Sequence, residues 1–150
     1  MQNYPDDMKV KDALQLYFTK YHFKDGGYHD RYFRIKIGRV FIPVPNTKGR
    51  IDAVKMHDIH HILTGYPALW KGEVMIAGWE LSSGCGKYYM AWILNTGSFL
   101  AGLFLYPCAL YSGLVAGSKI KTNLYKGFTY DETLLNSTVG QVRKRLMITT

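Results

Sequence analysis

The chain has 150 residues, of which 47% are apolar and 20% are charged, and it carries a net charge of +8. A chain of this length suits one domain, spanning 1–150, and this share of apolar residues excludes intrinsic disorder over most of it. The positive charge fits three kinds of partner: nucleic acid, an anionic membrane surface or an acidic small molecule. Because the basic residues are dispersed, with ten of the nineteen before Ile51, nucleic acid is not predicted as a partner.

Cysteine usage and the N-terminal segment bear on localisation. The two cysteines, Cys85 and Cys108, form neither a CxxC pair nor a zinc-ribbon spacing, which predicts a reducing compartment. The segment MQNYPDDMKVKD has no apolar run behind a basic start, and it is too acidic for a typical mitochondrial transit peptide. A bacterial-type cytoplasm is therefore predicted, unless the chain is an already mature form.

The first predicted element is an amphipathic helix. Its apolar side chains recur at helical spacing, at Val10, Ala13, Leu14, Tyr17, Phe18 and Tyr21. Asp6 or Asp7 is predicted to cap its start, after Pro5, and the turn residues at 24–27 are predicted to follow its end.

A strand-like arm comes next, from Tyr32 to Val44. Apolar and basic residues alternate from 33 to 37, which is typical of a strand. Gly38 and Arg39 indicate a turn into a hairpin, and the prolines at 43 and 45 favour an edge strand or a merely extended arm. The predicted fold class is therefore mainly α: a compact helical domain with a small strand or hairpin arm near the N-terminus.

Two helices are predicted around a central turn. The first runs from about Lys48, with Gly65 placed to cap its end, and the second runs from about Pro67 to Leu81. Further on, a last helix is predicted to carry the apolar residues Leu134, Leu135, Val139, Val142, Leu146 and Met147, with three basic residues near its end.

The stretch from Tyr88 to Ser118 contains no charged residue and is long enough to span a bilayer. Polar and small residues interrupt it, however, and its flanks show no one-sided basic bias. One or two helices buried in the protein core are therefore favoured over a membrane span. Pro107 is predicted to mark a kink or a break between two helices.

The sequence from His57 to Glu73 carries the candidate chemistry. His57 and His61 are four residues apart, so a helix places both imidazoles on one face. At ~1.5 Å per residue, His61 lies about 6 Å before the Gly65 turn and Glu73 about 9 Å beyond Pro67, so an antiparallel pair of helices brings them to nearly the same height. Asp58 is one step around the helix, either a peripheral ligand or an acceptor that orients an imidazole.

A plainer interpretation is that these histidines are ordinary structural side chains. On geometry alone, a metal site and structural histidines are about equally favoured. His60 points away from the pair and is predicted to be structural. Glu80, seven residues after Glu73, is predicted to be a solvated carboxylate. No nucleotide-binding or serine-nucleophile motif occurs.

The pattern HDxxH, eleven residues and Glu, at His57, Asp58, His61 and Glu73, resembles the family of ubiquinone (coenzyme Q) biosynthesis proteins that carry the fourth Coq name. HHILTGY is similar to the family's H-V-L-T-G-Y continuation, Gly72-Glu73 to its Gly-Glu, and STVGQVRKRLMI to its closing helix. The resemblance covers about 50–148. The chain before Ile51 departs from the pattern, and the role of segment 24–48 is left open.

The resemblance implies a mostly helical protein that binds a divalent metal near a cavity for a polyprenylated lipid. It implies zinc, held by His57, Asp58, His61 and Glu73, although two histidines and a carboxylate also suit Fe²⁺ or another divalent ion. It also implies decarboxylation, with hydroxylation at the same carbon, of a polyprenylated aromatic acid. The Tyr88 to Ser118 stretch is then expected to contribute to the lipid site.

The predicted partners are a polyprenylated aromatic or isoprenoid lipid, other quinone-biosynthesis proteins, the membrane surface and, as an open alternative, a second copy of the chain. The protein is predicted to lie in the cytoplasm, peripheral to the inner face of the membrane. Two other hypotheses stay open: a non-catalytic lipid-binding scaffold with a structural metal, and an integral membrane protein.

Overall fold

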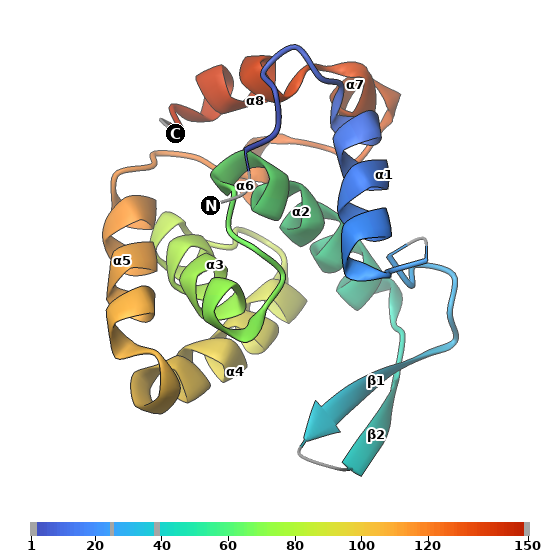
Figure 1. Ribbon diagram of the computed structural model, residues 1–150, viewed down its shortest axis with the longest axis vertical. Helices are drawn as coiled ribbons and strands as arrows, with labels where there is room; N and C mark the ends of the chain where they lie inside the picture. Colours follow the sequence, from blue (N-terminus) through green and yellow to red (C-terminus); the bar gives the residue numbers. More distant parts are fainter. Residues whose placement is uncertain (1–2, 25, 38–39, 149–150) are drawn as a thin grey trace.

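The computed structural model describes residues 3–24, 26–37 and 40–148 and confirms the mainly α fold with a small hairpin near the N-terminus (Figure 1). Its first half contains α1 (Val10–Tyr21), β1 (Tyr32–Ile37), β2 (Val40–Pro45) and α2 (Lys48–Thr64). Its second half contains α3 (Trp70–Ser83), α4 (Tyr89–Leu105), α5 (Pro107–Ser118), α6 (Leu124–Gly127), α7 (Glu132–Asn136) and α8 (Val139–Leu146).

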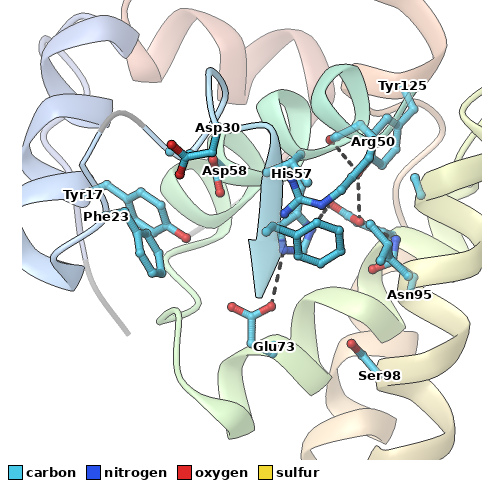
Figure 2. A pocket seen from close by; sticks show the side chains of 18 of the residues that line it. Tyr17, Phe23, Asp30, Arg50, His57, Asp58, Glu73, Asn95, Ser98 and Tyr125 are labelled. Atoms are coloured by element: carbon cyan, nitrogen blue, oxygen red, sulfur yellow. Dashed lines mark hydrogen bonds and ion pairs between the residues drawn. The ribbon is translucent and has the colours of Figure 1, made fainter. Parts of the chain in front are cut away.

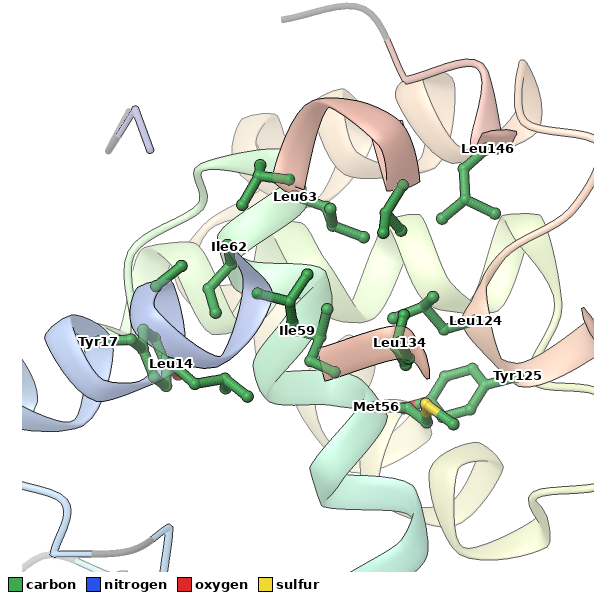
Figure 3. Packing of buried hydrophobic residues seen from close by; sticks show 14 of the residues in the cluster. Leu14, Tyr17, Met56, Ile59, Ile62, Leu63, Leu124, Tyr125, Leu134 and Leu146 are labelled. Atoms are coloured by element: carbon green, nitrogen blue, oxygen red, sulfur yellow. The ribbon is translucent and has the colours of Figure 1, made fainter. Parts of the chain in front are cut away.

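Helix α2 lies at the centre of the arrangement. It contacts α1, α3, α4, α6 and α8, whereas α3 packs mainly against α5 and α4 (Figure 1). Figure 3 shows Met56, Ile59, Ile62 and Leu63 of α2 inside the main apolar cluster, and all four are at most 1% exposed. Because α2 is covered on several sides, its polar residues are held in fixed positions by packing.

Helix α1 has the predicted extent, but the predicted cap is wrong. Its N-cap is Lys9, which makes no side-chain capping bond. The carboxylate of Asp6 instead accepts a hydrogen bond from the Arg143 guanidinium at 2.7 Å, which ties the N-terminal segment to α8. The chain pairs at the same place through a β-bridge between Lys9 and Thr138. Asp6 therefore forms a long-range ion pair with Arg143 and does not cap α1.

The strand pair is antiparallel, with Tyr32 opposite Pro45 and Ile37 opposite Val40. This confirms the predicted hairpin, while the predicted turn at Gly38 and Arg39 lies outside the described residues. The hairpin projects from the helical body (Figure 1). Prolines are tolerated in β2 because a two-stranded sheet consists only of edge strands.

The connection between α2 and α3 differs from the prediction at one end. Gly65 adopts the left-handed conformation, with φ of 73°, and caps α2 as predicted. Helix α3, however, begins at Trp70 and not at Pro67, and it runs to Ser83. Residues 66–69 form an extra loop in which the Leu69 amide donates to the Pro67 carbonyl at 2.8 Å. Glu73 consequently lies in the first turn of α3.

Helices α4 and α5 are separated at Pro107 as predicted, but the preferred buried interpretation of this stretch is wrong for much of α4. Only Ala91, Asn95 and Gly102 are buried there. Large side chains of α4, of α5 and of the residue between them are exposed: Tyr89, Trp92, Ile93, Leu100, Leu103, Phe104, Leu105, Tyr106 and Tyr111. Among the described residues, no helix combines the length and the apolarity that a membrane crossing requires.

The predicted last helix is two helices, α7 and α8, divided at 137–138. The Thr138 side chain accepts from the Gln141 amide, and the Gln141 side chain accepts from the Thr138 amide, so a capping box starts α8 anew. Arg143 is buried and donates to the carbonyls of Ile62 and Leu63 at the end of α2. This basic residue therefore fixes the position of α2.

The contact between α3 and α5 requires a glycine. A Cβ on Gly113 would lie 2.1 Å from the Met75 carbonyl oxygen, so we expect Gly113→Ala to push the two helices apart and to lower the free energy of unfolding by at least about 2 kcal/mol. Gly97→Ala in α4 is the matched control, because a Cβ there meets nothing within 4 Å and should stabilise by about 0.5–1 kcal/mol. Urea denaturation of both variants measures this difference, and equal effects would contradict the tight contact.

Candidate metal centre

The two predicted histidines and the predicted glutamate meet where α2 faces the start of α3. The Nε2 atoms of His57 and His61 are 3.1 Å apart. Glu73 places Oε2 at 3.4 Å from His57 Nε2 and Oε1 at 3.4 Å from His61 Nε2. These residues form a group of potential ligand atoms that all lie within 4.8 Å of one another. Figure 2 shows Glu73 pointing from α3 toward His57.

These separations fit the donor spacing of a zinc ion. Ligand atoms about 2.0–2.1 Å from a tetrahedral zinc ion are about 3.3 Å from one another. The 3.1 Å separation of the two Nε2 atoms is close to that edge length, and a different oxygen of Glu73 lies 3.4 Å from each of them. Three protein ligands leave a fourth position for another molecule. The donor set also suits Fe²⁺, so the geometry does not select one divalent ion.

The far nitrogen of each imidazole is held by an acceptor. His61 Nδ1 lies 2.8 Å from the Tyr66 carbonyl oxygen, and His57 Nδ1 lies 3.0 Å from Glu80 Oε1. When each Nδ1 donates its proton there, both Nε2 lone pairs face the space shared with Glu73. Acceptors of this kind orient the imidazoles of metal sites and raise their basicity.

Glu80 is not the solvated carboxylate that was predicted. It is fully buried, and Oε1 accepts from His57 and, at 2.7 Å, from His60. Its other oxygen, Oε2, accepts from Asn95 Nδ2 at 2.5 Å and from the Tyr125 hydroxyl at 3.1 Å. The prediction failed because α4 and α6 supply these partners, and neither is near Glu80 in the sequence.

His60 is structural, in agreement with the prediction. Its Nε2 accepts a hydrogen bond from the Leu124 amide at 3.1 Å, so its proton must be on Nδ1, which donates to Glu80. The ring is fully buried against Trp79 and Tyr125. Burial accordingly lowers the pKa of His60, although Glu80 opposes that effect.

The carboxylates of the site stay ionised. Burial alone would raise the pKa of Glu80, but His57 and His60 outweigh burial and hold that pKa well below its usual range. In the same way the hydrogen bonds from His57 and His61 outweigh the burial of Glu73 and lower its pKa. Two negative charges therefore surround the paired imidazoles, which favours a cation at this point.

Asp58 lies beside the group and not inside it. Its Oδ2 accepts a hydrogen bond from the Tyr28 hydroxyl at 2.6 Å, and it is not one of the three residues whose ligand atoms converge. Burial raises the pKa of Asp58 to about 6, although His57 and the Tyr28 bond oppose that rise. Sequence reasoning missed Tyr28, which lies in the turn-rich segment after α1.

The candidate centre opens onto a cavity of about 580 Å³. Asn95 and Ser98 approach it from α4, and Tyr17 and Phe23 from the other side (Figure 2). Segment 24–48, whose role was left open, contributes lining residues that include Gly26, Gly27, Asp30 and Phe33. The segment between α1 and α2 therefore forms one wall of the cavity.

We expect zinc binding to displace a proton from His57. Burial lowers the pKa of His57, but Glu80 and Glu73 outweigh burial and raise it well above 6.5. Below that raised pKa, zinc must replace the proton, so its affinity should rise about tenfold per pH unit. Because the folded pKa is raised, the rise should continue above pH 6.5. Titration calorimetry in buffers of different ionisation heat measures the proton release, and an affinity that levels off below pH 6.5 would contradict it.

Together these features define a helical protein with a candidate mononuclear centre of two histidines and one carboxylate, next to a cavity that His57 and Glu73 line. Comparisons of the chain with protein-family models, with curated proteins and with solved structures found no match.

Proposed function

We propose that this chain is a metal-dependent protein of ubiquinone biosynthesis that decarboxylates a polyprenylated aromatic acid. The observation that carries the proposal is the convergence of His57, His61 and Glu73 beside a cavity of about 580 Å³, which is large enough for an aromatic head group. The motif that spans these residues resembles the ubiquinone biosynthesis family, and that resemblance supplies the substrate class.

When bound, the ion supplies a positive charge that stabilises negative charge developing as carbon dioxide leaves. His57, His61 and Glu73 hold the position of that charge, and Glu80 and the Tyr66 carbonyl fix the two imidazoles. In decarboxylation without oxidation, the bond between ring and carboxyl carbon breaks and the ring carbon takes a proton. Asp58, with a pKa raised to about 6, is a titratable group that lines the cavity and is able to exchange that proton. The oxidative form of the reaction, in which the ring carbon is also hydroxylated, needs an oxidant such as dioxygen and a redox-active ion in place of zinc.

The apolar wall of the cavity supports the lipid part of the proposal. Ala91 and Leu94 of α4 line it together with Ala53 and Val54 of α2. The same helix carries exposed apolar side chains on its outer face. A polyprenyl tail that leaves the head-group cavity along α4 would thus remain on apolar surface, in the stretch predicted to contribute to lipid binding.

The experiment that tests the reaction uses a prenylated aromatic acid labelled at its carboxyl carbon. Metal-loaded protein should release labelled carbon dioxide, and His61→Ala should abolish the release. Parallel reactions with Zn²⁺ under argon and with Fe²⁺ under air distinguish simple from oxidative decarboxylation. If protein that binds one ion per chain releases no labelled carbon dioxide under either condition, the proposed decarboxylase activity is rejected.

The second candidate is a non-catalytic scaffold that binds polyprenyl lipid at the membrane surface and contains a structural metal. The exposed apolar side chains at the end of α4 favour it: Phe104 is 85% and Leu105 is 62% exposed. Apolar groups of this size at an unpartnered helix end are suited to insertion among lipid head groups. In this case loss of a metal ligand should unfold the protein, whereas a catalytic centre should lose activity with the fold retained.

We expect the double substitution of Phe104 and Leu105 by glutamate to weaken membrane binding at least about tenfold, because two apolar side chains lose their burial and two negative charges are added. Sedimentation with vesicles of phosphatidylcholine and phosphatidylglycerol measures the change. Leu16→Glu is the control, since Leu16 is 50% exposed but lies on α1. A loss as large in the control, or none in the double variant, would reject this membrane-binding surface.

A further inference from the structure

The cavity contains one guanidinium group that the candidate metal cluster does not use. Arg50 lies in the first turn of α2, two helical turns before His57, and lines the same cavity as His57 and Glu73. Figure 2 shows Arg50 together with His57 and Asn95 among the side chains that line the cavity. Nothing in the sequence singles out Arg50, because one arginine near a helix start is usually solvated.

The Arg50 side chain is held in place from two sides. Its guanidinium lies 3.6 Å from the centre of the Phe33 ring, and Nη1 donates a hydrogen bond to Asn46 Oδ1 at 2.6 Å. Asn46 is in turn fixed by donating to the carbonyls of Gly27 and Asp30. The loop after α1 and the end of the hairpin therefore set the direction of the guanidinium before any ligand binds.

The described residues place no carboxylate at ion-pair distance from this guanidinium. Within the described part of the chain, Arg50 Nε is the one buried side-chain nitrogen or oxygen without a hydrogen-bond partner. A buried donor left unpaired costs about 1–3 kcal/mol, and because Nε itself is buried, contact with a ligand falls to the terminal nitrogens of the guanidinium. An arginine stacked on a ring and open to a cavity is a typical binding group for a planar carboxylate.

We propose that Arg50 binds the carboxylate of the ligand, and that the opposite, phenolic end of the head group reaches the open position at His57, His61 and Glu73. This inference rests on the proposed function and names the group that recognises its acidic substrate. A singly charged carboxylate fits better than a phosphate dianion, because Asp58, Glu73 and Glu80 line the same cavity and repel additional negative charge.

The test compares two probes of nearly the same shape, one with a carboxylate and one with a neutral amide: 3-geranyl-4-hydroxybenzoate and the corresponding carboxamide. Calorimetry with zinc-loaded wild-type protein should show that the acid binds about 10- to 100-fold more tightly than the amide, the value of a charge-assisted pair. Arg50→Gln should reduce that preference to within about threefold and leave zinc binding unchanged. Arg50→Lys should retain part of the preference, because the charge remains and the two-pronged geometry is lost.

Arg145→Gln is the matched control. Its guanidinium also lies over a phenylalanine ring, 4.4 Å from the centre of Phe128, but it is exposed on α8 and does not line the cavity. This variant should keep the wild-type preference for the acid. Wild-type protein that binds acid and amide equally, or Arg50→Gln protein that keeps the full preference, would overturn the proposal.

The same comparison in metal-free wild-type protein separates this inference from the proposed function and needs no variant. If Arg50 binds the carboxylate, the preference for the acid persists after zinc is removed by a chelator. If the preference disappears with the metal, the ion holds the carboxylate, and the role of Arg50 is rejected while the metal-dependent function stands. Protein that never binds zinc but prefers the acid would reject the function and retain the anion site.

Discussion

Replacement of Glu80 by alanine is expected to lower the free energy of unfolding of the metal-free protein by about 3–5 kcal/mol, as for removal of one member of a buried charged network. The carboxylate is fully buried and accepts from His57, His60, Asn95 and Tyr125. Alanine leaves these groups unpaired in the protein interior. Urea denaturation with a chelator present measures the loss.

Glu73→Ala provides the comparison for that experiment. Its side chain is 37% exposed and contacts His57 and His61, but water can replace it. We expect it to change the stability of the metal-free protein by less than about 1 kcal/mol. Equal losses in the two variants would contradict the assignment of Glu80 to the support of the site and Glu73 to the ligand position.

The second large effect concerns metal affinity. His57→Ala, His61→Ala and Glu73→Ala should each weaken zinc binding by about 100-fold or more, since each ligand accounts for roughly 3 kcal/mol of a total of about 10–16 kcal/mol. Competition with a chromogenic chelator measures these constants. Glu80→Gln should weaken binding less, by about 10- to 100-fold, because it affects only the orientation of His57.

His29→Ala is the control for these ligand variants. His29 is exposed and lies outside the group formed by His57, His61 and Glu73. Zinc affinity should be unchanged in this variant. A loss comparable to that of His61→Ala would mean that the chain binds zinc through histidines in general and not through the cluster.

The sequence was sufficient to predict that His57, His61 and Glu73 come together. A helical period of 3.6 residues places the histidines on one face, and the Gly65 cap ends α2 where the chain must turn back. The predicted start of α3 was wrong, because the helix begins at Trp70 and not at Pro67. Glu73 nevertheless lies in its first turn and reaches both histidines, so the predicted meeting of the three residues did not depend on the exact start of α3.

The residues that support the centre could not be predicted in the same way. Glu80 has its role because of Asn95 and Tyr125, which are distant in the sequence. Arg50 has its role because Phe33 of the hairpin stacks on it and because the nearby Asn46 is held by the loop after α1. One signal was present for Glu80: it is the single charged residue in the second half of α3. Burial of α4 was overestimated because apolar composition does not reveal whether a partner covers a helix.

X-ray absorption at the zinc edge of protein loaded with one ion per chain tests the central claim most directly. The account predicts a shell of nitrogen and oxygen at about 2.0–2.1 Å with the outer scattering of two imidazoles. Sulfur at about 2.3 Å, from Cys85 or Cys108, or the absence of imidazole scattering would contradict a centre built from His57, His61 and Glu73.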